Sequence, residues 1–327
     1  MQNLNGQYSL SEQSLMNAVI CTKYGAPEVL ELQEVKTPEP KDDEVRIRIH
    51  FTSVTASDSL IRGLEFPFLP RMVLQMIFGF GKPRNPIMGM VCAGVVDKVG
   101  KNVTKFKVGD EVVAYGSKSP TKRRFGSYAE FICLPEDWFL TKKPSSISFK
   151  EAAAIPYGGL IADFYTEKAG IQPGQKVLIY GASGSIGTAA LQLAKHIGVE
   201  VTAVCSARNF GLVEYLGADK MIDYTSPDAV SQLEEYDVVL DAVGETKTSD
   251  VKEASKHALR DGGRYVSVDN GTPNPKITSF MKIIEMAGKG ELKPVIDRTF
   301  SLTDIVEAHH YVDRGHKKGN VMIEVNQ

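Results

Sequence analysis

The sequence has few cysteines, and their spacing excludes the common metal motifs. Among its 327 residues there are four cysteines, at positions 21, 92, 133 and 205, and none belongs to a Cys-x-x-Cys pair. This usage is typical of a reduced chain without structural zinc, so we expect a cytoplasmic protein. The first fifteen residues are polar and lack both the basic start and the apolar core of a signal peptide. We expect them to form a loose extension before Met16.

Long apolar runs and an excess of charge are also lacking. The longest apolar stretch, residues 66–80, is interrupted by Pro67, Pro70, Arg71 and Gly79, whereas a membrane-spanning helix needs about 20 largely apolar residues. The formal net charge of −2 provides no basic field for nucleic acid. The cluster Lys122–Arg124 is more often a solvated loop than a ligand site. We therefore expect neither a nucleic-acid partner nor a membrane partner.

The first half of the chain is typical of short antiparallel strands. Residues 45–49 alternate between apolar and basic side chains, as in a half-buried strand. Further short runs occur at 94–99, 111–114 and 128–133, separated by glycine-containing turns. This pattern of short strands and turns, from residue 17 to about residue 144, predicts an irregular β-barrel or sandwich.

The second half alternates between strands and helices. A capping box at Ser148–Glu151 begins a helix. Apolar runs at 177–180, 201–205, 221–223, 238–241 and 265–268 then predict five strands, with helices between several of them, which is the pattern of a parallel sheet covered on both faces. Residues 269–279 contain two prolines and no apolar run, so we expect no sixth strand. A monomer and a homodimer both stay open.

The most informative segment is the turn Gly181-x-x-Gly184-x-x-Gly187. It follows a four-residue apolar strand and precedes a helix with core spacing, within a βαβ unit of about 30 residues. In such a turn the first glycine permits the sharp exit from the strand, the second permits close approach to a diphosphate, and the third permits helix packing. The helix N-terminus then favours the negative phosphates. The segment predicts a dinucleotide site, and the alternative is a purely structural turn.

The residues after the second strand bear on the choice of cofactor. An NAD site usually places a carboxylate here, about 20 residues beyond the turn, to bind the ribose hydroxyls. This sequence instead has Ser206 and Arg208, which suit a 2′-phosphate. We therefore expect NADPH in preference to NADH. The alternative is that Arg208 is only a surface cation.

Several spaced motifs, in the right order, carry a resemblance to a known family. They are Lys23–Leu30, Val54–Asp58 with Arg62–Gly63, Lys107–Val113, Gly126–Glu130, Ala152–Pro156, Leu216–Ala218 with Ile222–Tyr224, and Gly315–Asn320. The chain from Met16 onward resembles the zinc-independent medium-chain dehydrogenase/reductases, in the quinone oxidoreductase and zeta-crystallin group.

This resemblance implies an α/β fold with two domains. A GroES-like β-barrel catalytic domain, residues 16–147 and 278–327, is interrupted by a Rossmann-type parallel-sheet nucleotide-binding domain, residues 148–277. The cofactor and a small apolar electrophilic substrate are expected in the cleft between them. The predicted cofactor-binding residues are Gly181, Ser183, Gly184, Ser185, Ile186, Gly187, Ser206, Arg208, Asn209, Tyr224, Val243, Val268, Asn270 and Asn320.

The positions of the catalytic zinc ligands in related alcohol dehydrogenases differ here. They hold Thr55, Met90 and Tyr157, and none is a usual zinc ligand, so we expect no metal. Thr55, Asp58 and Tyr157 are the catalytic candidates. Tyr157 is either a proton donor or a packing residue, and Asp58 more often anchors Thr55 or Arg62 than acts directly.

Without zinc, hydride delivery to an acceptor that is already electron-poor needs the least assistance. We therefore expect an NADPH-dependent reductase of quinones, enones or alkenals. The alternatives are a zinc-type alcohol dehydrogenase and a low-turnover NADPH-binding protein with a structural or sensory role.

The apolar segment 66–81 predicts a helix that either forms a wall of the substrate cleft, through Met76 and Phe80, or merely packs on the barrel.

Overall fold

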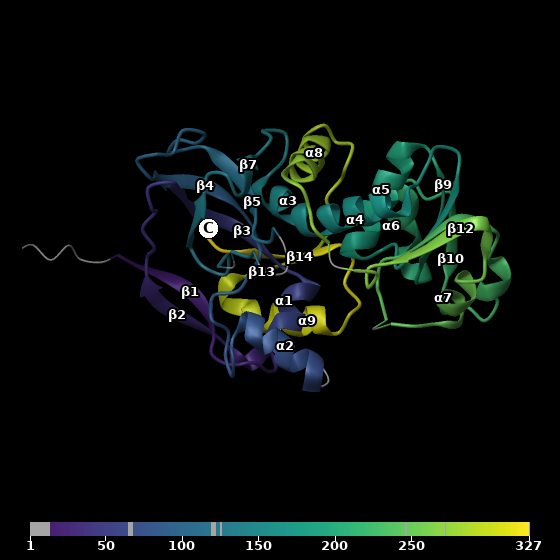
Figure 1. The fold of residues 1–327 in the computed structure, drawn as a ribbon, viewed down its shortest axis with the longest axis horizontal. Helices are drawn as coiled ribbons and strands as arrows, with labels where there is room; N and C mark the ends of the chain where they lie inside the picture. Colours follow the sequence, from purple (N-terminus) through teal and green to yellow (C-terminus); the bar gives the residue numbers. More distant parts are fainter. Residues whose placement is uncertain are drawn as a thin grey trace, which may run out of the picture.

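The computed structural model describes residues 14–64, 68–118, 122–124, 126–245, 247–271 and 273–326. The chain forms two lobes side by side, an antiparallel β lobe built mainly from the first half of the chain and a parallel α/β lobe (Figure 1). Residues 1–13 of the expected extension lie outside the described residues, and the first strand begins at Leu15. Within the described part of the chain, no helix combines the length and apolarity needed to cross a bilayer.

The β lobe is built on a seven-stranded sheet. Its strand order is β13-β14-β3-β4-β5-β7, and β6 also pairs with β3. A separate hairpin joins β1 (Leu15–Cys21) and β2 (Leu30–Lys36). The sheet strands are β3 (Glu44–Val54), β4 (Val91–Val99), β5 (Glu111–Tyr115), β6 (Phe131–Pro135), β7 (Phe139–Lys142), β13 (Ile296–Ser301) and β14 (Asn320–Glu324).

The parallel lobe contains five strands in the order β10-β9-β8-β11-β12, and every described pairing is parallel. These are β8 (Lys176–Tyr180), β9 (Glu200–Cys205), β10 (Lys220–Asp223), β11 (Tyr236–Asp241) and β12 (Leu259–Ser267). Helices pack on the sheet, and α4 (Pro156–Ala169), α5 (Ser185–Ile197), α6 (Phe210–Tyr215) and α7 (Asp250–Ser255) lie in this lobe (Figure 1). The prediction of five strands is confirmed for the described residues, which exclude residue 272 of the edge segment.

The remaining helices connect or cover the lobes. Near the β lobe lie α1 (Ala56–Gly63), α2 (Phe68–Phe78), α3 (Phe149–Ala154) and α9 (Ile305–Asp313), while α8 (Ile277–Gly288) packs on α4 and β7. Short 3-10 helices occur at η1 (Pro27–Val29), η2 (Ala207–Asn209), η3 (Ala229–Gln232) and η4 (Leu302–Asp304). The chain leaves the β lobe at α3, forms the parallel lobe, and returns through α8 and β13 to end in β14 (Figure 1).

Some sequence boundaries were misplaced. The last parallel strand begins at Leu259 instead of Tyr265, because it continues through the polar segment Arg260–Gly263 that has no apolar pattern. The expected strand at 128–133 begins three residues later, at Phe131. Residues 265–268 and 128–133 were nevertheless correctly predicted to contain strands. The errors concern only the residue at which each strand begins.

Candidate cofactor and active site

The glycine turn lies at the carboxyl end of β8, where three glycines allow close packing. Gly181 has a φ of +79°, and a Cβ atom there would lie 2.4 Å from a methyl carbon of Val243. A Cβ atom at Gly187 would lie 2.1 Å from the carbonyl oxygen of Gly181, so the helix can approach the strand only with glycine. Gly184 is the N-cap of α5, and a Cβ atom there would meet only one atom, at 3.5 Å.

These features fit a phosphate group at the start of α5. The first-turn N–H groups of an α-helix have no acceptor within the helix, and Ser185, Ile186 and Gly187 occupy this turn. The helix dipole adds positive potential at the same place. The open space at Gly184 lets a ligand approach the backbone closely.

The C-terminal segment lies directly over the turn. Gly184 and Gly319 form a parallel β-bridge, and the Gly319 N–H donates to the Ser183 carbonyl oxygen at 2.9 Å. The Ser185 hydroxyl donates to Oδ1 of Asn320 at 2.6 Å, and both residues are buried. Asn320 and Gly319 therefore make direct contacts between the two lobes at the turn.

The predicted adenosine side lies beyond Ser183. Nδ2 of Asn209 donates to the Ser183 hydroxyl at 3.0 Å, while the buried Oδ1 of Asn209 has no hydrogen-bond partner among the described residues. Arg208 is exposed, and its guanidinium makes no ion pair with a described residue. The Tyr224 ring lies 6.3 Å from the ring of Tyr180. Asn209, beside the turn, thus has an acceptor without a described partner, and the neighbouring Arg208 has a charge without one.

Two lysines near the tail were missed in the sequence. Nζ of Lys317 donates to the Gly319 carbonyl oxygen at 2.5 Å. Nζ of Lys247 donates to the carbonyl oxygen of Gly315, two residues before Lys317. Burial lowers the pKa of Lys317 to about 8, and the nearby Lys247 contributes to this shift. In the sequence, neither lysine can be told apart from an ordinary surface lysine. The β-bridge between Gly184 and Gly319 shows that the tail, which both lysines contact, lies beside the turn.

The predicted nicotinamide side lies at the carboxyl ends of β11 and β12. Val243 follows β11 and contacts Gly181, as the glycine geometry requires. Val268 follows β12, and its carbonyl oxygen accepts from the Tyr165 hydroxyl at 2.5 Å. Oδ1 of Asn270 accepts from the Ser267 N–H at 2.7 Å. These residues share one edge of the sheet with the turn, which is where parallel sheets bind ligands.

Below the nicotinamide side, a buried ion pair fixes the loop after β11. Nζ of Lys252 lies 2.8 Å from Oδ2 of Asp241, and both side chains are almost fully buried. Oδ1 of Asp241 accepts from the N–H groups of Val243 and Gly244, at 3.1 and 3.2 Å. The carboxylate thus holds the loop that places Val243, which the sequence did not indicate.

Thr55 and Asp58 form the start of α1. Thr55 is the N-cap and forms a capping box with Asp58, and the Thr55 hydroxyl donates to Oδ2 of Asp58 at 2.6 Å. Asp58 is fully buried, and burial raises its pKa to about 6. The geometry therefore places Asp58 as the anchor of Thr55. It does not pair with Arg62, which instead contacts Nδ1 of His309 at 2.9 Å and Asp313 at 2.7 Å.

Tyr157 lies near the beginning of α4. Its hydroxyl oxygen is 3.1 Å from the Ser57 hydroxyl of α1, and burial raises its pKa. Met90, Tyr115 and Tyr157 are buried in one core cluster. Ser57 was missed, although it stands between Thr55 and Asp58 in the quoted motif. It was missed because sequence alone does not show which α1 side chain points toward Tyr157.

The two halves of the site meet between α4 and α5. A Cβ atom at Gly158 would lie 2.4 Å from the carbonyl oxygen of Ser185 and 2.6 Å from its hydroxyl. Tyr157, the residue before Gly158, is thereby held next to the first turn of α5. The backbone next to Tyr157 therefore packs directly against the helix that begins at the glycine turn.

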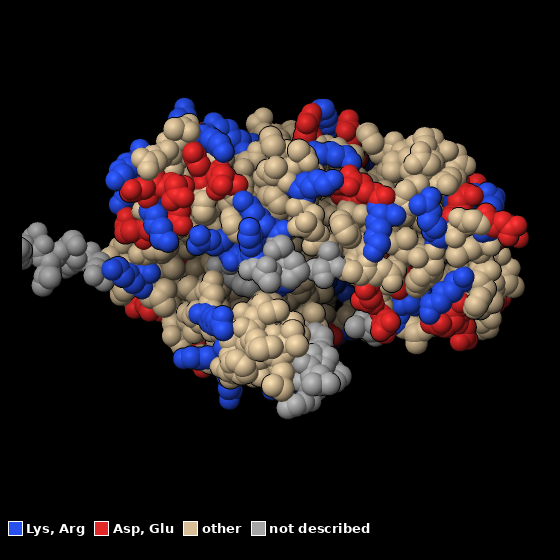
Figure 2. All heavy atoms as spheres, viewed as in Figure 1, with Lys and Arg blue, Asp and Glu red and all other residues tan. Residues whose placement is uncertain are grey.

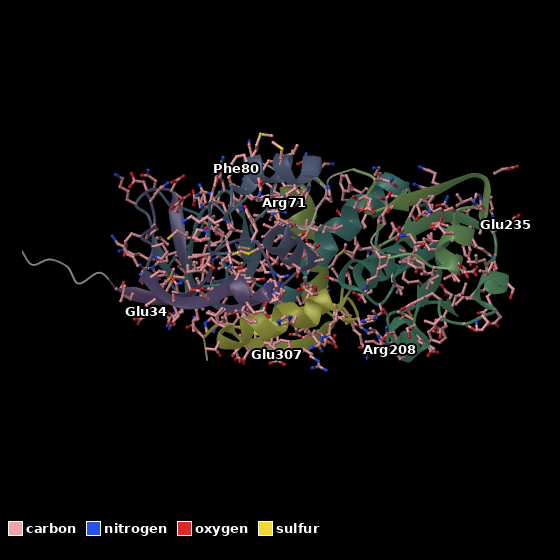
Figure 3. All side chains as sticks on the ribbon, turned by 90° about the horizontal axis from the view of Figure 1, so that it is seen from below. Glu34, Arg71, Phe80, Arg208, Glu235 and Glu307 are labelled. Atoms are coloured by element: carbon pink, nitrogen blue, oxygen red, sulfur yellow. The ribbon has the colours of Figure 1, made fainter. Side chains whose placement is uncertain are left out.

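Two expectations about the surroundings concern helix α2 and the basic cluster. Within the segment 66–81, Met76 of α2 and Phe80, which follows the helix, are 53% and 63% exposed. Figure 3 shows Phe80 and Arg208 at opposite edges of the molecule, so this apolar face lies away from the predicted adenosine phosphate. Arg123 of the expected solvated cluster is half-buried, with its guanidinium 4.9 Å from the centre of the Phe78 ring.

Among the described residues, no group of three or more His, Cys, Asp or Glu side chains is arranged to hold a metal ion. Met90 and Tyr157, at two of the positions that hold zinc in alcohol dehydrogenases, are buried in the same core cluster as Tyr115. His309 is buried and His310 is half-buried and bonded to Glu28 at 2.7 Å, as expected for one packed and one solvated histidine.

Comparisons with known proteins place these features in context. Residues 41–145 match the model described as the alcohol dehydrogenase GroES-like domain. Residues 185–289 and 273–323 match two models described as zinc-binding dehydrogenase.

Two relatives and one solved structure are similar over most of the chain. The chain is 33% identical over 330 residues to a 2-methylene-furan-3-one reductase of Solanum lycopersicum, covering 96% of this chain and 80% of the relative. It is 30% identical over 323 residues to a chloroplastic NADPH-dependent alkenal/one oxidoreductase of Arabidopsis thaliana, covering 94% and 79%. The quinone oxidoreductase structure from Coxiella burnetii has a TM-score of 0.80 and 25% identity, covering 96% of this chain and 100% of that chain.

Proposed function

The chain belongs to the quinone oxidoreductase group of the medium-chain dehydrogenase/reductase family, and from this premise we propose that it is an NADPH-dependent reductase of quinones or activated double bonds. The observation that carries the proposal is the contact of Gly158 with Ser185. This contact joins a phosphate-binding turn to a buried pair of hydroxyl groups in one site. The names of the two relatives, an enone-type reductase and an alkenal/one oxidoreductase, support the same reaction class.

The residues at the turn fit the cofactor that this function requires. The first-turn N–H groups of α5 would hold the diphosphate, and Asn209 offers an unpartnered acceptor for a ribose hydroxyl. Arg208, which has no described ion pair, would bind the 2′-phosphate. Lys317 and Lys247 would add positive charge from the side of the tail. We propose Val243, Val268 and Asn270 as the nicotinamide side.

The chemistry divides between the cofactor and the protein. When bound, NADPH supplies the hydride. Reduction of an enone places negative charge on its carbonyl oxygen, and reduction of a quinone does the same on its oxygen atoms. Burial keeps the Tyr157 hydroxyl protonated at neutral pH, so Tyr157 can donate a hydrogen bond to that oxygen and then a proton.

Ser57 and Thr55 support the donor. The Ser57 hydroxyl, 3.1 Å from that of Tyr157, orients the phenol. Thr55 is fixed by Asp58 at the start of the same helix, and it thereby fixes the position of Ser57. Tyr157 is buried in the same core cluster as Met90 and Tyr115, and this burial limits the access of water. This apolar environment favours small apolar electrophiles over sugars or charged acids.

The lobes can also be assigned roles. We propose that the β lobe, with residues 16–147 and 278–327, binds the substrate, and that residues 148–277 bind the nucleotide. Packing suggests a division close to Ile155, because α3 contacts β3, β4 and β14 whereas α4 contacts α5 and β12. The protein is proposed to act as a monomer or a homodimer.

NADPH oxidation with a panel of acceptors tests this function. We expect turnover with quinones, enones or alkenals, faster with NADPH than with NADH, and little oxidation of simple alcohols by NADP⁺. The variant Tyr157→Phe serves as the control for background reduction. Alcohol oxidation that depends on added zinc would favour the dehydrogenase alternative, and tight NADPH binding without turnover would favour a binding protein.

A further inference from the structure

The outer face of α2 carries the densest group of exposed apolar side chains in the described structure. Five large side chains within nine residues are exposed: Met72 40%, Val73 51%, Met76 53%, Ile77 38% and Phe80 63%. Figure 2 shows the described part of this helix as a continuous tan surface in the lower centre of the molecule. Contiguous exposed apolar surface of this kind marks an interaction site more often than chance.

From residue 66 to residue 96, the segment that carries this face has charges of one sign. Residues 66–96 contain no Asp or Glu, and they contain three cations, Arg71, Lys82 and Arg84. All three are exposed, and none makes an ion pair with a described residue. Elsewhere in the protein cations are commonly paired, as Lys98 is with Glu39 at 2.5 Å and Lys195 with Asp219 at 2.7 Å. The exposed face of α2 is therefore apolar, and the charged side chains of its own segment are all positive.

The contacts described between the helix and the β lobe lie at and just beyond its carboxyl end. The Tyr24 hydroxyl donates to the Gly79 carbonyl oxygen at 2.9 Å, and Phe78 packs against a core cluster that includes Cys21 and Met88. The guanidinium of Arg123 lies over the Phe78 ring. In Figure 3, Arg71 and Phe80 lie at the edge of the molecule formed by α2. This attachment holds the helix in place while its apolar face stays outside.

We propose that α2 docks the protein on the surface of an anionic lipid bilayer, with its apolar side chains in the headgroup and acyl boundary. Helices with Met, Ile and Phe on one face and cations beside them bind membranes in this way without crossing them. Arg71, Lys82 and Arg84 would lie close to the anionic headgroups. A short helix is enough for this geometry, so the lack of a spanning segment, from which no membrane partner was expected, does not oppose it.

Charge argues against a second copy of this chain as the occupant. In a two-fold symmetric dimer the same face meets itself, so the three unpaired cations of one subunit would face those of the other. No acidic residue of 66–96 would balance them. An anionic bilayer neutralises the same charges and covers the apolar side chains at once. Docking would also bring the enzyme to the phase in which long-chain apolar acceptors dissolve.

Vesicle co-sedimentation of the full-length protein tests the proposal. The vesicles are phosphatidylcholine alone and phosphatidylcholine mixed with phosphatidylglycerol, each at low and at raised salt. We expect binding to the anionic vesicles that weakens with salt. The double variant Met76→Ser/Phe80→Ser should lose at least tenfold in partition coefficient, and Lys82→Gln/Arg84→Gln should lose severalfold and most of the salt dependence.

Matched controls separate docking through α2 from nonspecific adsorption to lipid and from misfolding. Met281→Ser and Val108→Ser remove exposed apolar side chains elsewhere, 54% and 60% exposed, and should bind like the wild type. Thermal unfolding checks that each variant is folded, and turnover of a short-chain quinone should be unchanged. No binding to either vesicle would overturn the proposal, as would binding that the α2 variants do not reduce. A dimer in lipid-free sedimentation that Met76→Ser/Phe80→Ser dissolves would assign the face to a second copy instead.

Discussion

Gly158 packs so closely on Ser185 that a Cβ atom at residue 158 would lie 2.4 Å from the Ser185 carbonyl oxygen. This one contact sets the distance between the first turn of α4, which carries Tyr157, and the first turn of α5, which ends the phosphate turn. Neither glycine spacing nor helix periodicity marks it in the sequence. The contact makes the relative placement of the hydroxyl pair and the cofactor phosphates depend on the absence of a side chain.

The variant Gly158→Ala should therefore separate α4 from α5. Because the obstructing atoms are backbone, we expect a loss of about 1–3 kcal/mol in unfolding free energy and at least severalfold weaker NADPH binding. Urea unfolding and fluorescence titration measure the two effects. Gly211→Ala is the matched control, since nothing lies within 4 Å of a Cβ atom there, and it should be neutral or slightly stabilising. Equal behaviour of the two variants would contradict the role of the contact.

Arg208 is expected to select NADPH. A charge-assisted hydrogen bond contributes about 1.5–3 kcal/mol, so Arg208→Ala should weaken NADPH binding by about tenfold to a hundredfold and leave NADH nearly unchanged. Calorimetric titration with both cofactors measures this. Arg71→Ala is a suitable control, because Arg71 is also exposed and lies at the opposite edge of the molecule (Figure 3). If both cofactors lose affinity equally, Arg208 does not bind the 2′-phosphate.

The sequence predicted the parts of the fold that rest on local pattern. The five parallel strands, the capping box at Ser148 and the helix after Gly184 follow from periodicity and turn chemistry, and the structure has all of them. The strands β1, β2, β7 and β13 were not anticipated. Few side chains of β2 and β13 are buried and β7 has four residues, whereas β1 is largely buried and was overlooked. Their positions are determined by pairing with distant strands, which local pattern does not contain.

The candidate site was predictable in one half only. The phosphate turn is a contiguous motif, so its residues could be named directly. Ser57, Lys247 and Lys317 join the site through contacts between segments that are far apart in the sequence. The segment 66–81 was correctly predicted to contain a helix. Whether the apolar face of that helix meets the cleft or the solvent depends on packing, which the periodicity of the sequence does not determine.

Activity is expected to be independent of metal. The positions that hold catalytic zinc in alcohol dehydrogenases have Thr55, Met90 and Tyr157, and no metal-ligand group occurs among the described residues. Dialysis against a chelator should therefore leave the rate of NADPH oxidation within measurement error. Elemental analysis of the dialysed protein verifies that metal is gone. Stoichiometric zinc, together with loss of activity when it is removed, would contradict a zinc-free mechanism.

Burial of Asp58 should make the stability of the fold depend on pH. Its pKa is raised from 3.8 to about 6, so the folded protein favours the neutral carboxyl group. The associated stability is fully present below pH 3.8 and is lost as the pH rises through about 6. The loss is about 3 kcal/mol at about 1.4 kcal/mol per pKa unit. The isosteric Asp58→Asn variant should remove this dependence.

Urea unfolding of the wild type and Asp58→Asn, at pH values below 4 and near 7, provides the comparison for Asp58. The variant keeps an acceptor for the Thr55 N–H, so the capping box is retained in part. We expect the variant to gain in relative stability as the pH rises from the lower to the higher value. A difference between the two proteins that is the same at both pH values would mean that folding does not shift the pKa of Asp58.

Tyr157 is the residue on which the proposed chemistry depends most directly. Phenylalanine keeps the ring, which is buried in the core cluster that includes Met90 and Tyr115, and it removes only the hydroxyl that faces Ser57. If that hydroxyl donates to the substrate oxygen, Tyr157→Phe should lower kcat by about a hundredfold or more, while the Kd for NADPH and the unfolding free energy change little. Ser57→Ala should have a smaller effect in the same direction, because Tyr157 would retain its proton but lose its orientation.

Steady-state kinetics with a quinone and an enone, in ordinary and in deuterated water, separate this role from packing. A kcat that stays at the wild-type value in Tyr157→Phe would make Tyr157 a packing residue and leave water as the proton source.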